Sequence, residues 1–141
     1  MSRRVRNFAI KAAISDSTAE VFTFAAAKTM YGGKQISTGD SIFIFAGENE
    51  GGCGLIACGT VASAKAVPMT PGVARQTPRV SITVTRTKLA KRRLGRSELR
   101  PFSEWNDGRP ETELNFKFYR QATNKVVGLS DDAAAFLRQY F

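Results

Sequence analysis

The sequence contains no histidine, two cysteines and a single tryptophan among its 141 residues. Without histidine, the chain cannot use an imidazole for acid–base catalysis, for activating a nucleophile or for binding a metal. Cys53 and Cys58 are too few for a four-ligand zinc site, and their C-x-x-x-x-C spacing differs from the C-x-x-C of redox pairs. We interpret them as reduced thiols in or near a sheet, and we expect no metal and no cofactor.

Long apolar segments are missing as well. No apolar run approaches the roughly 20 residues needed to cross a bilayer. The first residues, MSRRVRNFAI, are basic but lack an apolar stretch followed by a small-residue cleavage site. We therefore expect a cytoplasmic protein without a membrane segment, folded as one domain over residues 1–141.

Acidic residues are also scarce: 12 Asp and Glu stand against 21 Lys and Arg, which gives a net charge of +9. The excess is concentrated in residues 86–100, RTKLAKRRLGRSELR, where Glu98 is the only acid. The cations of this stretch are Arg86, Lys88, Lys91, Arg92, Arg93, Arg96 and Arg100. Such a cluster is typical of a surface that binds nucleic-acid phosphates. The alternative is a solvated basic face that serves only solubility.

The hydrophobic pattern predicts many short strands and a few helices. We expect strands at 8–12, 41–45, 55–67 with a bend at Gly59, 79–87, 114–119 and 125–129. We expect helices at 18–30, within 87–99, and from Ser130 or Asp131 to the end, with 68–78 and 102–113 as loops. This order indicates an α+β fold, a small mixed and mostly antiparallel β-barrel with flanking helices.

Residues 8–61 combine several motifs in an order that a known superfamily shares. The first strand pairs an aromatic with a lysine in Phe8-Ala9-Ile10-Lys11, and GDSIFIF (39–45) is a Gly-Asp turn entering an apolar strand. A glycine-rich hairpin then leads into GLIACGTV (54–61). The chain thereby resembles the PUA-like superfamily, and within it the EVE-type domain, although Ala12 and Ala13 replace the usual Ser-Glu-Pro after the lysine.

The resemblance implies a five- or six-stranded barrel that binds RNA or DNA. In relatives of the EVE, YTH and SRA groups, a pocket lined by aromatic residues accepts a flipped or modified base. A base has a flat π-face and a hydrogen-bonding edge, so that recognition requires stacking plus a few donors and acceptors. The base-pocket candidates in this chain are Lys11, Tyr31, Phe45, Trp105, Asp107 and Asn124.

The resemblance places three of these candidates. Lys11 matches the family lysine that faces the pocket region, and Tyr31 and Phe45 occupy the regions that flank the pocket in relatives. Each also has a plain structural alternative. Lys11 is then an ordinary exposed strand residue, and the two aromatic side chains belong to the core.

The other three candidates follow from their chemistry. Trp105 and Asp107 share one loop, so that the indole could stack on a base while the carboxylate accepts from its amine. The amide of Asn124 suits an adenine edge. In the alternatives, Trp105 plugs one end of the barrel, Asp107 closes a turn with Gly108, and Asn124 is a hairpin-turn residue.

These observations predict a non-enzymatic module that binds RNA or DNA, modified DNA included. A basic face would hold the phosphates while the pocket accepts a base. One alternative is an enzyme that acts on a nucleotide or RNA through Asp, Glu or Lys, although the sequence shows no spaced acid–base pair. Another is an interaction module whose basic face meets an acidic protein.

Overall fold

The computed structural model of the chain describes residues 5–48, 52–121 and 125–141. Within these residues six strands form a closed barrel, in the order β1-β3-β4-β5-β2-β6. They are β1 (Asn7–Ala12), β2 (Val21–Met30), β3 (Ser41–Ala46), β4 (Gly54–Ala66), β5 (Arg79–Leu89) and β6 (Lys125–Gly128). The pairs β1–β3 and β2–β6 are parallel and the other four are antiparallel, which confirms the predicted mixed barrel.

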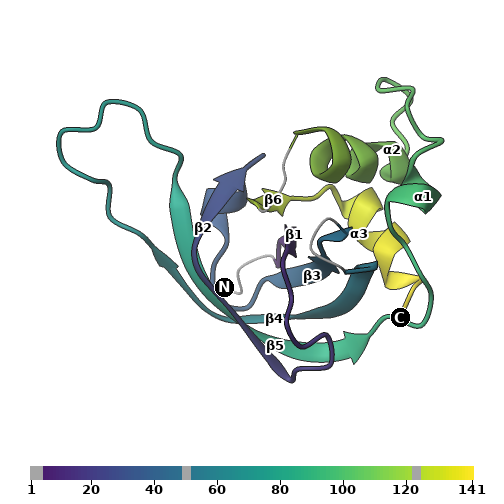
Figure 1. Ribbon diagram of the computed structural model, residues 1–141, viewed down its shortest axis with the longest axis horizontal. Coiled ribbons are helices and arrows are strands. Elements are labelled where there is room, and N and C mark those ends of the chain that lie inside the picture. Colours follow the sequence, from purple (N-terminus) through teal and green to yellow (C-terminus); the bar gives the residue numbers. More distant parts are fainter. Residues whose placement is uncertain (1–4, 49–51, 122–124) are drawn as a thin grey trace.

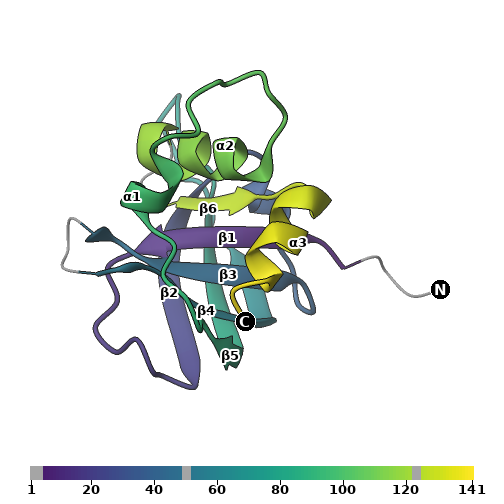
Figure 2. The same ribbon diagram turned by 90° about the vertical axis from the view of Figure 1, so that its right-hand side faces the viewer.

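Helices cover one side of this barrel (Figures 1 and 2). They are the short 3₁₀ helix η1 (Gly33–Gln35), α1 (Arg96–Leu99), α2 (Pro110–Asn115), the π-helix η3 (Phe116–Gln121) that continues α2, and α3 (Asp131–Arg138). On the side away from α1 and α3, the connection between β4 and β5 extends well beyond the barrel (Figure 1). No helix among the described residues is long and apolar enough to cross a membrane.

The alternation along β3 explains how barrel and helices pack together. Ile42 and Ile44 point into the barrel interior, whereas Phe43 and Phe45 belong to a second core between the barrel and the helices. That second core also contains Leu94, Leu99, Leu114, Phe118 and Leu137. Two-sided burial of an apolar strand is what the sequence predicts for 41–45, and the structure confirms it.

Gly59 has a specific role in β4. The pairing of β4 with β5 shifts register between Cys58 and Gly59. A Cβ atom at this position would lie 2.4 Å from the carbonyl oxygen of Thr85, so only glycine allows the two strands to approach this closely. The register shift therefore lies at the position where the sequence predicts a bend.

The prediction of a helix over 18–30 is wrong, because Val21–Met30 form strand β2. This strand is hydrogen-bonded to β5 on one side and to β6 on the other, and it closes the barrel. Its alanine-rich middle has high helix propensity, but pairing on both edges overrides a preference worth less than about 1 kcal/mol per residue. A register shift between Phe24 and Ala27, with Ala26 at φ 49°, interrupts the alternation that would have indicated a strand.

The prediction of a strand at 114–119 is also wrong, since these residues lie in α2 and η3. Leu114 and Phe118 are spaced one helical turn apart, and both are buried in the second core. The helix within 87–99 is shorter than expected: β5 continues to Leu89, and only Arg96–Leu99 are helical. The strands at 8–12 and 125–129 and the terminal helix are confirmed, with Ser130 as the N-cap of α3.

Candidate nucleic-acid interface

A basic segment, residues 88–100, begins in the last two residues of β5 and continues through α1. Buried Leu94 and Leu99 hold it to the second core, and the Leu94 carbonyl accepts a hydrogen bond from Leu55 N at 2.8 Å. The charged side chains between these anchors are exposed. The backbone is therefore fixed while the cations face solvent.

Three cations of the segment pair with no acid in the part of the chain that the structure describes. Among the described residues, Lys88, Lys91 and Arg100 make no side-chain hydrogen bond and no ion pair. Lys91 lines a concave surface of about 390 Å³ together with Arg92 and Arg93. The charge of Lys88, Lys91 and Arg100 is thus available to an anionic partner.

The other cations of the cluster also hold the structure together. Arg86 Nε donates to the Ala19 carbonyl at 2.9 Å, and Arg92 donates to the Gln139 carbonyl at 2.8 Å. Arg93 lies 3.6 Å from Glu48 and 3.4 Å from Glu98. The charge of Arg93 is therefore partly neutralised by these two carboxylates.

Glu48 joins the basic segment to the barrel. Its Oε1 accepts from the backbone N–H of Arg96 at 2.8 Å and from the hydroxyl of Tyr119 at 2.7 Å. Burial, together with this hydrogen bond and the charge of Glu48, raises the pKa of Tyr119 well above its ordinary value. The Tyr119 hydroxyl therefore stays protonated and acts as a donor.

Lys11 contacts the ring of the same tyrosine. Its side chain is buried, with 4% exposure, and Nζ donates to the Phe118 carbonyl at 2.7 Å. Nζ is 4.4 Å from the centroid of the Tyr119 ring, and the Arg96 guanidinium is 5.4 Å from it. Lys11, a predicted pocket residue, and Arg96, a predicted phosphate ligand, therefore lie near the same tyrosine ring.

Tyr119 and Glu48 were not among the candidates from the sequence. Tyr119 lies in a stretch predicted to be a strand and a polar turn, and Glu48 lies in a loop rich in glycine and acid. Neither residue has a signal in the sequence. In the structure Tyr119 lies in the π-helix η3, and π-helical turns often occur at functional sites. Contacts 71 residues apart in the chain, such as the one between these two, leave no local pattern.

The remaining pocket candidates lie elsewhere. Phe45 is fully buried, with its ring 4.8 Å from that of Phe118, in the core position that was its alternative. Trp105 and Tyr31 are 39% and 37% exposed, and both rings contact Phe116, at 5.5 and 6.3 Å. These two aromatics thus share a neighbour on η3, away from Lys11.

Asp107 forms the turn described by its alternative. Its carboxylate accepts from Arg109 N at 2.9 Å and from Thr112 Oγ1 at 3.0 Å, and Gly108 has φ 75°. The hydrogen bond from Arg109 N holds the pKa of Asp107 below its ordinary value. Asp107 therefore supports the start of α2. Asn124 lies outside the described residues.

A second concave region, of about 640 Å³, lies at the start of β1, whereas Lys11 is near the end of that strand. Its lining includes Arg6, Tyr31, Gln35 and Lys117. Arg6 donates to the Gln35 side chain at 2.8 Å, so these polar groups are already paired.

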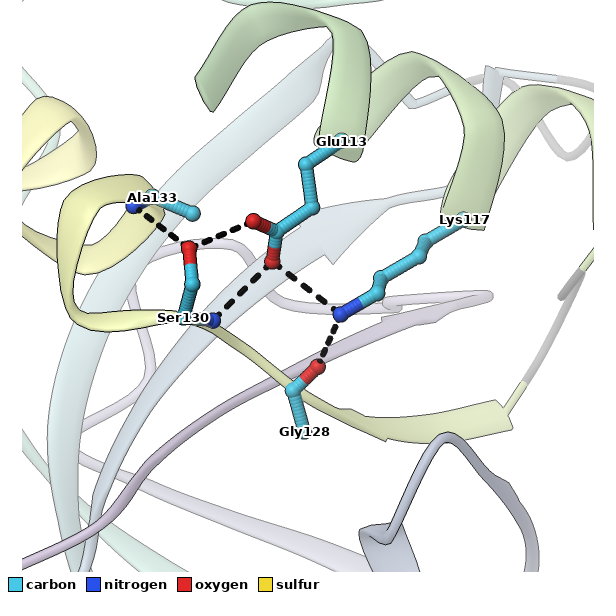
Figure 3. Close-up of polar contacts among 5 residues, drawn as sticks. All are labelled: Glu113, Lys117, Gly128, Ser130 and Ala133. Carbon is cyan, nitrogen blue, oxygen red and sulfur yellow. Dashed lines mark hydrogen bonds and ion pairs between the residues drawn. The ribbon is translucent and has the colours of Figure 1, made fainter. Parts of the chain in front are cut away.

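Figure 3 shows the network that fixes the helices beside this region. Glu113 of α2 accepts from Lys117 Nζ at 3.0 Å and from Ser130 N at 3.0 Å, and Lys117 also donates to the Gly128 carbonyl at 2.6 Å. Ser130 Oγ in turn caps α3 through Ala133 N at 3.1 Å. Burial opposes ionisation of Glu113, but the bonds from Ser130 and Lys117 lower its pKa overall. The network therefore ties α2, β6 and α3 together.

The described residues include no group of three or more Cys, Asp or Glu that could hold a metal ion. The cations, the buried lysine and the tyrosine instead offer hydrogen-bond donors, positive charge and one aromatic face. These are groups that recognise an anion or a base.

The closed six-stranded barrel with its flanking helices matches the PUA-like fold that the sequence resemblance predicts. No family model and no curated protein matches the sequence. The solved structure of human THYN1 protein in complex with 5-methylcytosine containing DNA superimposes with a TM-score of 0.64 at 13% identity, covering 95% of this chain and 96% of that one.

Two further solved structures share this architecture. The DUF55 domain of human thymocyte nuclear protein 1 gives a TM-score of 0.64 at 14% identity, over 94% of this chain and 96% of that chain. A hypothetical protein from Leishmania major gives 0.61 at 14% identity, over 97% and 95%. At such identities the likeness establishes the fold, over nearly the full length of each chain.

Proposed function

We propose that this protein is a non-enzymatic nucleic-acid-binding module. The observation that carries the proposal is the meeting of Lys11, Tyr119 and Arg96 at the end of the barrel where the basic segment passes. Support also comes from a solved structure of the same fold, whose protein is in complex with 5-methylcytosine containing DNA.

The phosphates of the ligand lie along the basic segment. Lys88, Lys91 and Arg100 supply exposed positive charge, and the buried leucines keep the segment in place before the ligand arrives. Binding then requires little ordering of the protein, so less of the electrostatic gain is lost to conformational entropy. These contacts position a strand without reading its sequence.

A base enters beside Tyr119 in this proposal. The Tyr119 ring provides a stacking face worth about 1–3 kcal/mol per base. Glu48 supplies an acceptor for an exocyclic amine, and Lys11 supplies a donor for a carbonyl or ring nitrogen.

These groups suit ligand binding better than acid–base catalysis. The chain has no histidine, and the raised pKa of Tyr119 makes its hydroxyl a poor proton acceptor near neutral pH. Glu48 is held by the Tyr119 hydroxyl and the Arg96 backbone, so it serves as a fixed acceptor.

Fluorescence polarisation with a labelled single-stranded oligonucleotide, across a series of salt concentrations, tests the proposal. The variant Lys91→Gln/Arg100→Gln should lower the dependence of log K on log salt by about 1.4, since each phosphate contact to a single strand contributes about 0.7. The control Lys34→Gln/Arg109→Gln removes the same charge from exposed positions outside the basic segment and should leave the slope unchanged. Absence of binding at low salt to single strands and duplexes of both DNA and RNA would refute the function.

A further inference from the structure

The β4–β5 arm, residues 62–79, extends beyond the rest of the barrel. Strand β3 pairs with β4 only as far as Thr60, whereas β4 continues to Ala66. The connection to β5 then reaches away from the helices into solvent (Figure 1). One edge of β4 and the whole connection are therefore accessible to a partner.

The arm is built as a fixed structure. The Gln76 side chain donates to the carbonyls of Thr70 and Val73, at 2.7 and 3.0 Å, and accepts from Thr70 N at 2.8 Å. At its base, the Pro78 carbonyl accepts from both the backbone and the hydroxyl of Thr29, at 3.1 and 2.8 Å. The connection, residues 67–78, is longer than the typical loop of about 4–6 residues in compact domains.

The arm carries only one sign of charge. Residues 51–97 contain nine Lys and Arg and no Asp or Glu, and Lys65, Arg75 and Arg79 of this set lie on the arm. Lys65 and Arg75 are exposed, and among the described residues neither makes a side-chain hydrogen bond or ion pair. A stretch of this kind is complementary to a polyanion and repels a basic protein surface.

Two apolar side chains stand among these cations. Met69 and Val73 are 54% and 50% exposed near the tip of the arm. They border a hollow of about 340 Å³ whose lining also includes Lys28, Arg75 and Arg79. Apolar side chains flanked by cations are the combination with which proteins enter a nucleic-acid groove, the apolar groups against the bases and the cations on the phosphates.

We propose that the β4–β5 arm is a second nucleic-acid contact, which enters a groove of a duplex while the basic segment holds the backbone at the barrel. Lys65 and Arg75 neutralise phosphates on the groove walls, and Met69 and Val73 contact base edges within the groove. This inference rests on the proposed function and assigns it a double-stranded ligand. DNA and RNA duplexes share the required chemistry, so both are tested.

Salt-dependent polarisation measurements on the full chain, with a 20-base-pair DNA duplex, the matching RNA duplex and one DNA strand alone, test the arm. Lys65→Gln/Arg75→Gln should lower the salt slope on the preferred duplex by about 1.8 and should leave the slope on the single strand unchanged. Met69→Ser/Val73→Ser should weaken duplex binding by about tenfold at an unchanged slope, because it removes apolar contact and not charge. Lys34→Gln/Arg109→Gln is the matched charge control, and thermal melting confirms that each variant is folded.

The outcomes separate the arm from the basic segment. If Lys65→Gln/Arg75→Gln leaves the duplex slope at its wild-type value while Lys91→Gln/Arg100→Gln lowers it, the arm is not a contact and the proposed function stands. If the arm variants weaken duplex and single strand equally, the groove assignment is wrong. If the wild-type protein binds none of the ligands, the proposed function fails and the arm proposal fails with it.

Discussion

Replacing Glu48 by glutamine should strengthen nucleic-acid binding while leaving the fold intact. Among the described residues, Glu48 and Glu98 both form ion pairs with Arg93 of the basic segment, Glu48 at 3.6 Å. Glutamine keeps an oxygen at the position of Oε1, so the hydrogen bonds from Tyr119 and from Arg96 N persist. The substitution therefore changes charge more than structure.

The expected magnitudes follow from exposure. The side chains of Arg93 and Glu48 are 54% and 18% exposed, and pairs that are partly open to water contribute about 0–1 kcal/mol to stability. The free energy of unfolding should thus change by less than about 1 kcal/mol. Against a duplex, one additional uncompensated cation should steepen the salt slope by up to about 0.9.

Polarisation across salt concentrations gives the slope, and urea unfolding gives the stability. Ultraviolet titration above pH 10 offers a third readout, because loss of the Glu48 charge should lower the pKa of Tyr119 towards its ordinary value. Glu104→Gln is the control, since it removes an exposed acid outside the basic segment. A slope that stays constant or becomes shallower in Glu48→Gln would refute the placement of the ligand beside Glu48.

Three further substitutions test other parts of the structure. Phe45→Ala should cost about 3–5 kcal/mol of unfolding free energy in urea, because it empties a fully buried site against Phe118. Trp105→Ala should cost about 1 kcal/mol through lost contact with Phe116 and should leave binding affinity unchanged in polarisation, whereas a selective loss of binding would place Trp105 in the site. Glu113 has a pKa below its ordinary 4.5, so its stabilisation is complete above that pH and disappears as pH falls through the lower, folded value. The melting temperature between pH 2 and 6 should consequently depend less on pH in Glu113→Gln than in the wild type. An unchanged pH dependence would show that the contacts of Glu113 with Ser130 and Lys117 do not contribute to stability.

The barrel could be predicted because most of its strands have a recognisable hydrophobic pattern in the local sequence. Apolar and polar residues alternate in 79–87, and 41–45 is apolar on both faces. Both patterns reflect which side chains are buried, and turn residues mark the ends of both segments. β2 could not be recognised in the same way, because its register shift at Ala26 breaks the period and its alanines favour helix. Its strand state is set by two neighbours, one of which is almost 100 residues away along the chain.

Of the candidate site, the cations could be predicted and their partners could not. Charge density is a property of local sequence, so residues 86–100 stand out without a structure. Glu48 and Tyr119 could not be predicted as site residues, because they come together only through the contact between the loop after β3 and η3. Lys11 was identified through resemblance, and its burial under Tyr119 follows from the register of β1 and β3, which sets Lys11 opposite Phe45.

The π-helix explains why the aromatic candidates divide between two regions. From Phe116 to Tyr119, successive side chains of η3 point in different directions: Phe116 contacts Tyr31 and Trp105, whereas Phe118 is buried against Phe45. Tyr119, the next residue, reaches Lys11 and Glu48. In a strand, Tyr119 would point to the face opposite Phe116 and Phe118. The three side chains would then lie on only two faces, whereas in η3 they point in three directions. The lone tryptophan therefore packs on the outer side of the element whose other side carries the tyrosine of the proposed base site. Because the indole contacts Phe116 of η3, its fluorescence should report on movement of η3 when a ligand binds.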